Sequence, residues 1–216
     1  MDSDLLDKLA QKTITKQQLC QAVAENFELL PQLVKGVSSP KASIRYGCSS
    51  VLVDLSAQYP KKLYPCLDIF IGLLDSKYRI LTWNATVAIA NLCCVDVNQK
   101  FDAVFCKYFN LINSGYLITA ANVVANAGKI ALAKPHFMPQ ITNELLKIDA
   151  LPTTPHLTDE CKRVLAEHAI ASFDMFFGGL DAAQKQMVLG FVAGHQDSSR
   201  KTLGCKASVF LQRWGA

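Results

Sequence analysis

Few residues in this sequence have a type and spacing that could support a reaction. Cys161 and His168 lie seven residues apart, so on a helix they would share one face, with Glu160 and Glu167 beside them. Such a set could hold a metal ion, or the imidazole could activate the thiol. A structural zinc site needs roughly four ligands and a catalytic site about three, and the sequence offers no obvious further ligand. We therefore expect a core-facing cysteine and a hydrogen-bonded histidine here.

The other cysteines do not suggest a metal site or a disulfide framework. The chain has eight cysteines, and none forms a Cys-x-x-Cys pair or neighbours a histidine at zinc-finger spacing. Cys93 and Cys94 are adjacent, so on a helix their side chains would point about 100° apart and could not easily chelate one ion. Free cysteines and an acidic, amphipathic N-terminal segment predict a cytoplasmic protein. We expect no metal and no cofactor.

Composition and charge are those of an ordinary globular protein. Half of the 216 residues are hydrophobic, 19% are charged, and the formal net charge is +4. Basic residues outnumber acidic ones only slightly in each half of the chain, so no stretch forms a clear nucleic-acid footprint. Two uncharged runs, 80–95 and 108–128, are too short or too polar to span a membrane and read as helices buried between other helices.

Apolar residues recur at three- and four-residue intervals nearly throughout, and breaks fall about every 20 residues. The pattern predicts helices at about 3–11 and 16–36, followed by helix pairs and a last helix, at 41–59 and 61–75, 79–95 and 98–113, 117–134 and 137–149, 159–177 and 181–194, and 200–214. The spacing from pair to pair is about 38 to 42 residues, a solenoid period. We expect one domain over 1–216, with cap helices in 1–40, four helix pairs in 41–199 and a terminal helix in 200–216.

Several breaks carry residues that start helices. Capping-box spacing joins a Thr or Asp to a Gln three residues later at Thr15, Asp96 and Asp181. Ser39 precedes Pro40, a favoured first helical residue, and Thr158 precedes two acidic residues.

The first helices of three pairs and the last helix align in register. Segments 44–52, 81–89, 118–126 and 203–211 each begin with an aliphatic residue and continue with small and β-branched ones. A basic residue such as Arg45 precedes the small-residue run. In these features the sequence resembles the HEAT/armadillo superfamily over nearly its whole length. The resemblance implies an all-α, right-handed α-α superhelix of antiparallel helix pairs, and it carries over no activity.

Asn84 and Asn122 occupy nearly the same position in successive repeats, and Trp83 adjoins the first of them. Armadillo repeats that bind extended peptides use Trp and Asn side chains, with Asn pairing to peptide amides. There, Asn follows Trp by four residues in the last helix of a repeat, whereas Trp83 and Asn84 are adjacent in a first helix. The residues are therefore either a peptide site or an interhelix asparagine beside a core tryptophan.

Three hypotheses about function remain open. The favoured one is a non-enzymatic scaffold that binds a protein or peptide partner, with candidate binding residues Trp83, Asn84, Asn122, Arg45 and Tyr46. An alternative is a HEAT-like DNA-binding protein of the alkylpurine DNA glycosylase type, although the balanced charge argues against tight DNA binding. A third is a small HEAT-like lyase or chaperone. The sequence indicates no membrane partner and no particular oligomeric state.

Overall fold

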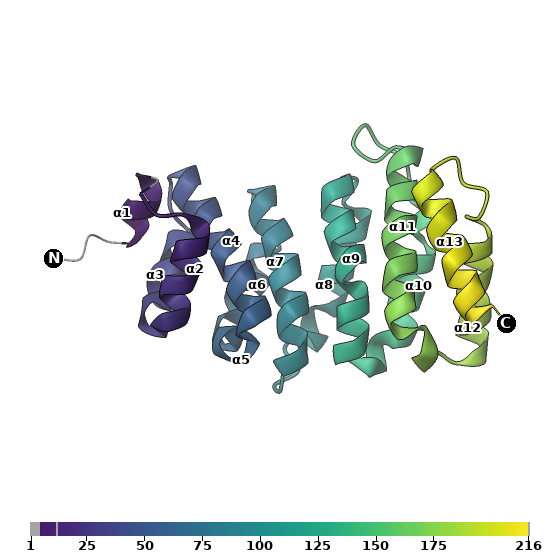
Figure 1. Cartoon of the computed structure of the whole chain (residues 1–216), viewed down its shortest axis with the longest axis horizontal. Helices are drawn as coiled ribbons and strands as arrows, with labels where there is room; N and C mark the ends of the chain where they lie inside the picture. The colour runs from purple at the N-terminus through teal and green to yellow at the C-terminus, as the bar shows by residue number, and fades with distance from the viewer. Residues whose placement is uncertain (1–4, 12, 216) are drawn as a thin grey trace. The chain divides into compact units, whose positions relative to one another are not determined.

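The computed structural model describes residues 5–11 and 13–215, and these are helical apart from turns and one isolated bridge between Thr154 and Leu157 (Figure 1). Internal contacts divide the chain into two compact units, Met1–Asn98 and Gln99–Ala216, called unit 1 and unit 2 below.

Unit 1 is a two-layer arrangement of helices. Its helices are α1 (Leu5–Ala10), α2 (Lys16–Glu25), α3 (Leu30–Gly36), α4 (Ala42–Gln58), α5 (Pro60–Leu63), α6 (Leu67–Leu73) and α7 (Arg79–Leu92). Helix α4 packs between α2 and α7, while α3 packs on α4 and α6 on α7. Fully buried aliphatic residues such as Leu52, Leu55 and Ile89 fill the space between the helices, which is the main source of stability for such a unit.

Unit 2 repeats this arrangement. Its helices are α8 (Phe105–Asn110), α9 (Leu117–Ala133), α10 (Met138–Leu146), α11 (Asp159–Phe176), α12 (Ala182–Ala193) and α13 (Lys201–Trp214). In Figure 1, α9, α11 and α13 run side by side, with α10 and α12 behind them, and the contacts between the helices agree. We call the first three the front layer of unit 2.

Helices α9 and α11 of unit 2 pack closely against each other, and Gly128 lies at their crossing. A Cβ atom at this position would lie 2.6 Å from Met175 Sδ and 3.0 Å from the carbonyl oxygen of Ser172. One turn away, the Ser172 hydroxyl donates to the Val124 carbonyl oxygen at 2.6 Å. The absence of a side chain at residue 128 therefore lets the two helix backbones approach closely.

The predicted all-α solenoid is confirmed, and so are most helix positions. Helices α4, α7, α9, α11, α12 and α13 lie within a few residues of the predicted ranges. The predicted helix 61–75 is interrupted by a 3₁₀ turn at Tyr64–Cys66, because Pro65 has no backbone N–H to donate. The prediction of one helix over 16–36 is wrong, because Asn26 adopts an extended conformation and its side chain accepts a hydrogen bond from the Glu28 N–H.

The cap predictions have mixed outcomes. Thr15 and Gln18 form a complete capping box, and the side chains of Thr158 and Asp181 cap α11 and α12. The box predicted at Asp96 is wrong: Gln99 has a φ of +54°, so no helix starts there. The start predicted at Pro40 is also wrong, because α4 begins at Ala42.

Among the described residues, no helix is long and apolar enough to cross a membrane. Runs 80–95 and 108–128 lie instead in helices and turns of the two units.

Candidate functional site

Asn84 joins two helices of unit 1. Its side-chain amide on α7 donates to the Ser49 hydroxyl on α4 at 2.9 Å, and Asn91 donates in the same way to Ser56 at 3.0 Å, two turns further along. Both serines are buried. Trp83 is half-buried on the same helix. The amide of Asn84 thus satisfies a buried hydroxyl between helices, which is a structural contact.

Asn122 has a different environment, in unit 2. Its side-chain N–H donates to the Ile118 carbonyl oxygen of its own helix at 2.8 Å, and its backbone carbonyl accepts from Asn126. Its side-chain oxygen makes no hydrogen bond to any other residue in the described ranges. The two asparagines, which lie at nearly the same repeat position, therefore have different partners, one between helices and one within a helix.

Arg45 is a buried cation in unit 1. Its side chain sits at the start of α4, and the residue is only 6% exposed. The guanidinium carbon lies 3.8 Å from the ring centroid of Tyr78 and 4.8 Å from that of Tyr46. Nη1 donates to the carbonyl oxygens of Ser39 at 2.8 Å and Pro40 at 3.2 Å, while Nη2 donates to the Tyr46 hydroxyl at 3.4 Å. Nε is buried without an acceptor.

A cavity of about 370 Å³ opens beside this guanidinium. It lies where α3 ends, α4 begins, α6 ends and α7 begins. We call it the Arg45 pocket, and its polar lining comes from Ser38, Ser39, Arg45, Ser76, Lys77 and Tyr78. No acidic residue lines the pocket, and no carboxylate among residues 5–11 and 13–215 lies within ion-pair distance of Arg45.

Two serines give the Arg45 pocket hydroxyl groups. The Ser39 oxygen accepts from the Lys41 N–H at 3.2 Å, and the Ser76 oxygen accepts from the Tyr78 N–H at 3.1 Å. Each hydroxyl is therefore held in place as an acceptor and keeps its own hydrogen to donate. Sequence reasoning selected Arg45 and Tyr46 and missed Tyr78, Ser39 and Ser76. The available signal was a serine three residues before the start of a first helix, at positions 37 residues apart in the two repeats.

The front layer of unit 2 exposes large apolar side chains. Exposed fractions are 51% for Ile118, 52% for Leu132, 45% for Met175 and 58% for Val209. Between α11 and α13 runs a groove of about 250 Å³, whose lining is chiefly apolar and includes Ile170, Val209 and Phe210. Arg213 at its rim donates to the Asp174 carboxylate at 3.0 Å, and the Trp214 indole N–H donates to the same carboxylate at 2.6 Å.

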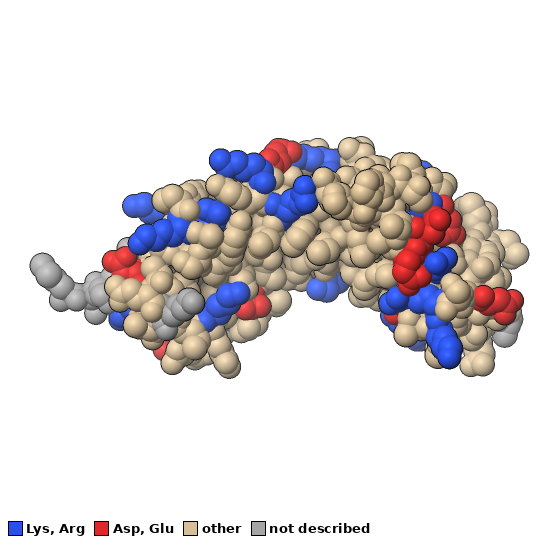
Figure 2. Space-filling model, turned by 90° about the horizontal axis from the view of Figure 1, so that it is seen from above, with Lys and Arg blue, Asp and Glu red and all other residues tan. Residues whose placement is uncertain are grey.

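An ion-pair network joins α11 to the start of α13, and Figure 2 shows acidic and basic side chains crowded together over these helices. Glu167 accepts from Arg200 at 2.8 Å and from Thr202 at 2.8 Å, and its carboxylate lies 3.1 Å from Lys206. Burial alone would raise the pKa of Glu167, but these hydrogen bonds outweigh it and lower the pKa from 4.5 to about 2.

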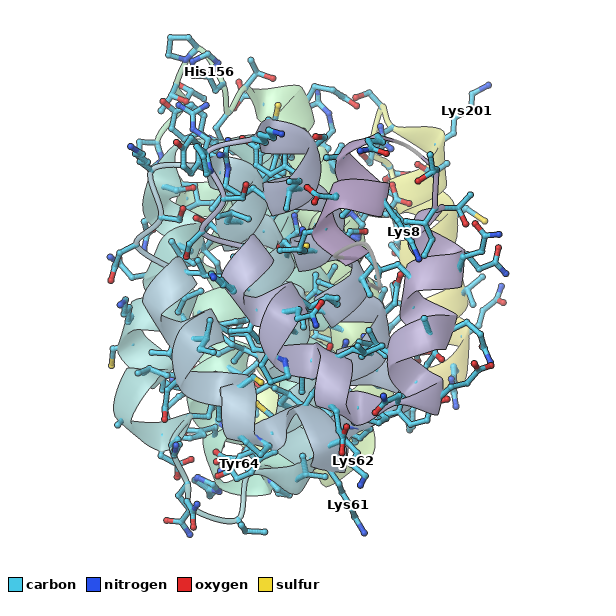
Figure 3. The ribbon with its side chains drawn as sticks, turned by 90° about the vertical axis from the view of Figure 1, so that its left-hand side faces the viewer. Lys8, Lys61, Lys62, Tyr64, His156 and Lys201 are labelled. Atoms are coloured by element: carbon cyan, nitrogen blue, oxygen red, sulfur yellow. The ribbon has the colours of Figure 1, made fainter. Side chains whose placement is uncertain are left out.

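Basic side chains elsewhere are dispersed. Figure 3 shows Lys61 and Lys62 projecting away from the ribbon at the end of α5. In unit 2, ion pairs occupy Lys134, Lys147, Lys162, Arg163, Arg200, Lys206 and Arg213.

Cys161 and His168 both lie on α11. The Thr158 hydroxyl approaches the Cys161 sulfur at 3.3 Å. Burial, followed by the charge of Lys206, lowers the pKa of His168, so that the imidazole is held neutral at physiological pH. Within the described ranges, no group of three or more His, Cys, Asp or Glu side chains is arranged to hold a metal ion.

Comparison with known proteins identifies the fold. No protein-family model matches the chain, and no curated protein matches its sequence. Among solved structures, the chain is similar to a designed armadillo repeat protein, with a TM-score of 0.61 and 18% sequence identity over 96% of this chain and 90% of the designed one. The chain therefore has the all-α solenoid fold of the HEAT/armadillo type, and the fold leaves its function open.

Proposed function

We propose that this protein is a non-enzymatic scaffold that binds a protein or peptide partner on the front layer of unit 2. The observation that carries the proposal is the set of exposed apolar side chains on three adjacent helices, Ile118 and Leu132 on α9, Met175 on α11 and Val209 on α13. Single exposed apolar residues are ordinary, but several on one helix layer are typical of an interaction surface.

The groove between α11 and α13 suits an amphipathic helix. Its floor is apolar at Ile170 and Phe210, and charged side chains of Lys206 and Arg213 stand at its edge. A helix that buries one apolar face in such a groove places its anchors at intervals of three and four residues. The side-chain oxygen of Asn122 supplies an acceptor for a backbone or side-chain N–H of the partner on the same layer.

Paired substitutions on the two layers test this proposal. Met175→Glu with Val209→Glu places two charges on the front layer, whereas Met187→Glu on α12 changes an equally exposed methionine on the other layer. Proteins that cross-link to the full chain in its own cells are quantified for each variant. We expect the main partner to be lost from the double variant and retained by Met187→Glu. Retention by both, with both variants folded, would refute the proposal.

The ion pairs of unit 2 also bear on the DNA-binding alternative. The basic side chains of unit 2 that form ion pairs are less available to phosphates, so the DNA-binding alternative gains no support there.

All eight cysteines are free thiols, which supports our proposal of a reducing compartment such as the cytoplasm.

A further inference from the structure

The charge of Arg45 is not balanced by any described residue. A guanidinium stays protonated at every physiological pH, and removing it from water costs free energy unless its charge is compensated. The Tyr78 ring and the carbonyl oxygens of Ser39 and Pro40 give it polar contacts, but none of them carries a formal negative charge. The buried cation therefore creates a positive potential that favours an anion in the adjacent cavity.

The other groups around the Arg45 pocket also favour an anion. Lys77 lines it, with its ammonium 5.2 Å from the Tyr78 ring centroid and no carboxylate partner among the described residues. The hydroxyls of Ser39 and Ser76 each keep a hydrogen to donate. Helices α4 and α7 both start here without a side-chain cap, so the positive ends of two helix dipoles meet at this place.

The repeat itself shows that the fold does not require an arginine at this position. Arg45 aligns with Thr82 and Thr119 in the next two repeats. The Thr82 hydroxyl donates to the Leu73 carbonyl oxygen at the end of α6 at 3.3 Å, whereas Arg45 donates to the Ser39 carbonyl oxygen in the turn after α3. A threonine can thus satisfy the packing, and the arginine adds a charge.

We propose that the Arg45 pocket binds a phosphoryl group. A carboxylate has two oxygens, whereas the donors of Arg45, Ser39, Ser76 and Lys77 come from four side chains and match the larger number of phosphoryl oxygens. The planar guanidinium, stacked on Tyr78, is pre-oriented for this contact. The site lies in unit 1 and is independent of the partner surface proposed for unit 2.

The test is a titration of the ¹⁵N-labelled full chain, followed by the amide signals of Ser39, Ser76, Lys77 and Tyr78. The probes are inorganic phosphate, N-acetyl-phosphoserine amide and acetate, at constant ionic strength. We expect both phosphate probes to shift these amides saturably with half-saturation below about 10 mM, and acetate to produce at most a small linear drift. The probe that binds more tightly shows whether the pocket prefers a free phosphate anion or a phosphorylated side chain.

Variants separate the site from general electrostatics. Arg45→Thr, which introduces the residue of the next repeats, should weaken phosphate binding at least about tenfold while the remaining spectrum stays folded. Lys61→Gln removes an exposed cation outside the pocket and should leave the binding nearly unchanged. If Arg45→Thr does not fold, Ser76→Ala should still weaken binding several-fold. Unsaturable shifts, equal binding of acetate, or unchanged binding in these variants would overturn the proposal.

Discussion

At the scale of single residues, Asn84 combines a predicted binding role with an observed structural contact. Its amide is the donor to the buried Ser49 hydroxyl, so Asn84→Ala should lower the free energy of unfolding by about 1 kcal/mol. Asn122→Ala removes a bond within one exposed turn and should cost less than about 0.5 kcal/mol. Urea unfolding of the two variants measures both. Equal losses would show that the contact between α4 and α7 contributes little.

Gly128 offers a second comparison, with a control in the same unit. Gly128→Ala places a methyl group against the Ser172 carbonyl and Met175 at the crossing of α9 and α11, and we expect it to destabilise the protein by about 1 to 3 kcal/mol. Gly190 lies in the interior of α12 with nothing within 4 Å of its Cβ position, so Gly190→Ala should stabilise it by up to about 1 kcal/mol. Thermal unfolding should shift in opposite directions. If Gly128→Ala instead raised the unfolding temperature as Gly190→Ala does, α9 and α11 would be able to separate without cost.

The helices themselves were largely predictable from the sequence, because apolar spacing and cap residues act locally. Thr15, Thr158 and Asp181 cap helices as their spacing indicates. The failures also have local causes. Asn26 breaks a continuous apolar pattern by capping the next turn, and Gln99 adopts a left-handed conformation that its capping-box spacing does not reveal. Periodicity alone does not encode either choice.

Only some of the residues around the Arg45 pocket could be selected from the sequence. Arg45 and Tyr46 could be selected because they stand directly before the small-residue run of a first helix, where the HEAT pattern has a basic residue. Tyr78 and Ser76 belong to the next repeat, and their approach to Arg45 depends on how α7 packs on α4. That packing depends on side chains from both helices, so a linear pattern does not predict which residues meet.

The attachment of α13 to α11 should depend on pH through Glu167. Its pKa is lower in the folded protein, so its contribution to stability is present above the unfolded value of 4.5 and is lost as the pH falls toward about 2. We expect Glu167→Gln to cost about 2 kcal/mol at pH 7, where hydrogen bonds to a charged group are lost, and progressively less below pH 4.5.

Urea midpoints of wild type and variant at pH 7, 4.5 and 3 measure this difference. Glu144→Gln is the control, because Glu144 pairs with Lys147 across a single exposed turn, and such pairs contribute little. A difference between wild type and Glu167→Gln that stays constant down to pH 3 would exclude the ion-pair network as its source.

At the scale of the whole molecule, the two units differ in how their cysteines are exposed. The buried thiols are Cys20, Cys48, Cys66 and Cys93, all in unit 1, whereas the exposed ones are Cys94, Cys106 and Cys205. Burial raises the pKa of Cys66 and, together with the charge of Asp54, that of Cys20, which further lowers their thiolate fraction. Thiol chemistry therefore reports separately on the surface of the chain and on the opening of unit 1.

We expect a thiol reagent to label the native chain in two phases, a fast one for the three exposed cysteines and a slow one for the four buried ones, with half-exposed Cys161 between them. Leu52→Ala creates a cavity in the core of unit 1 and should cost at least about 2 kcal/mol. The slow thiols react only after unit 1 opens. A loss of about 2 kcal/mol in the free energy of opening should therefore make the slow phase about 30-fold faster. The fast phase should not change, since its thiols already lie at the surface. Mass spectrometry of the labelled peptides assigns each phase, and a slow phase insensitive to Leu52→Ala would mean that the buried thiols react by local fluctuations without opening of the core.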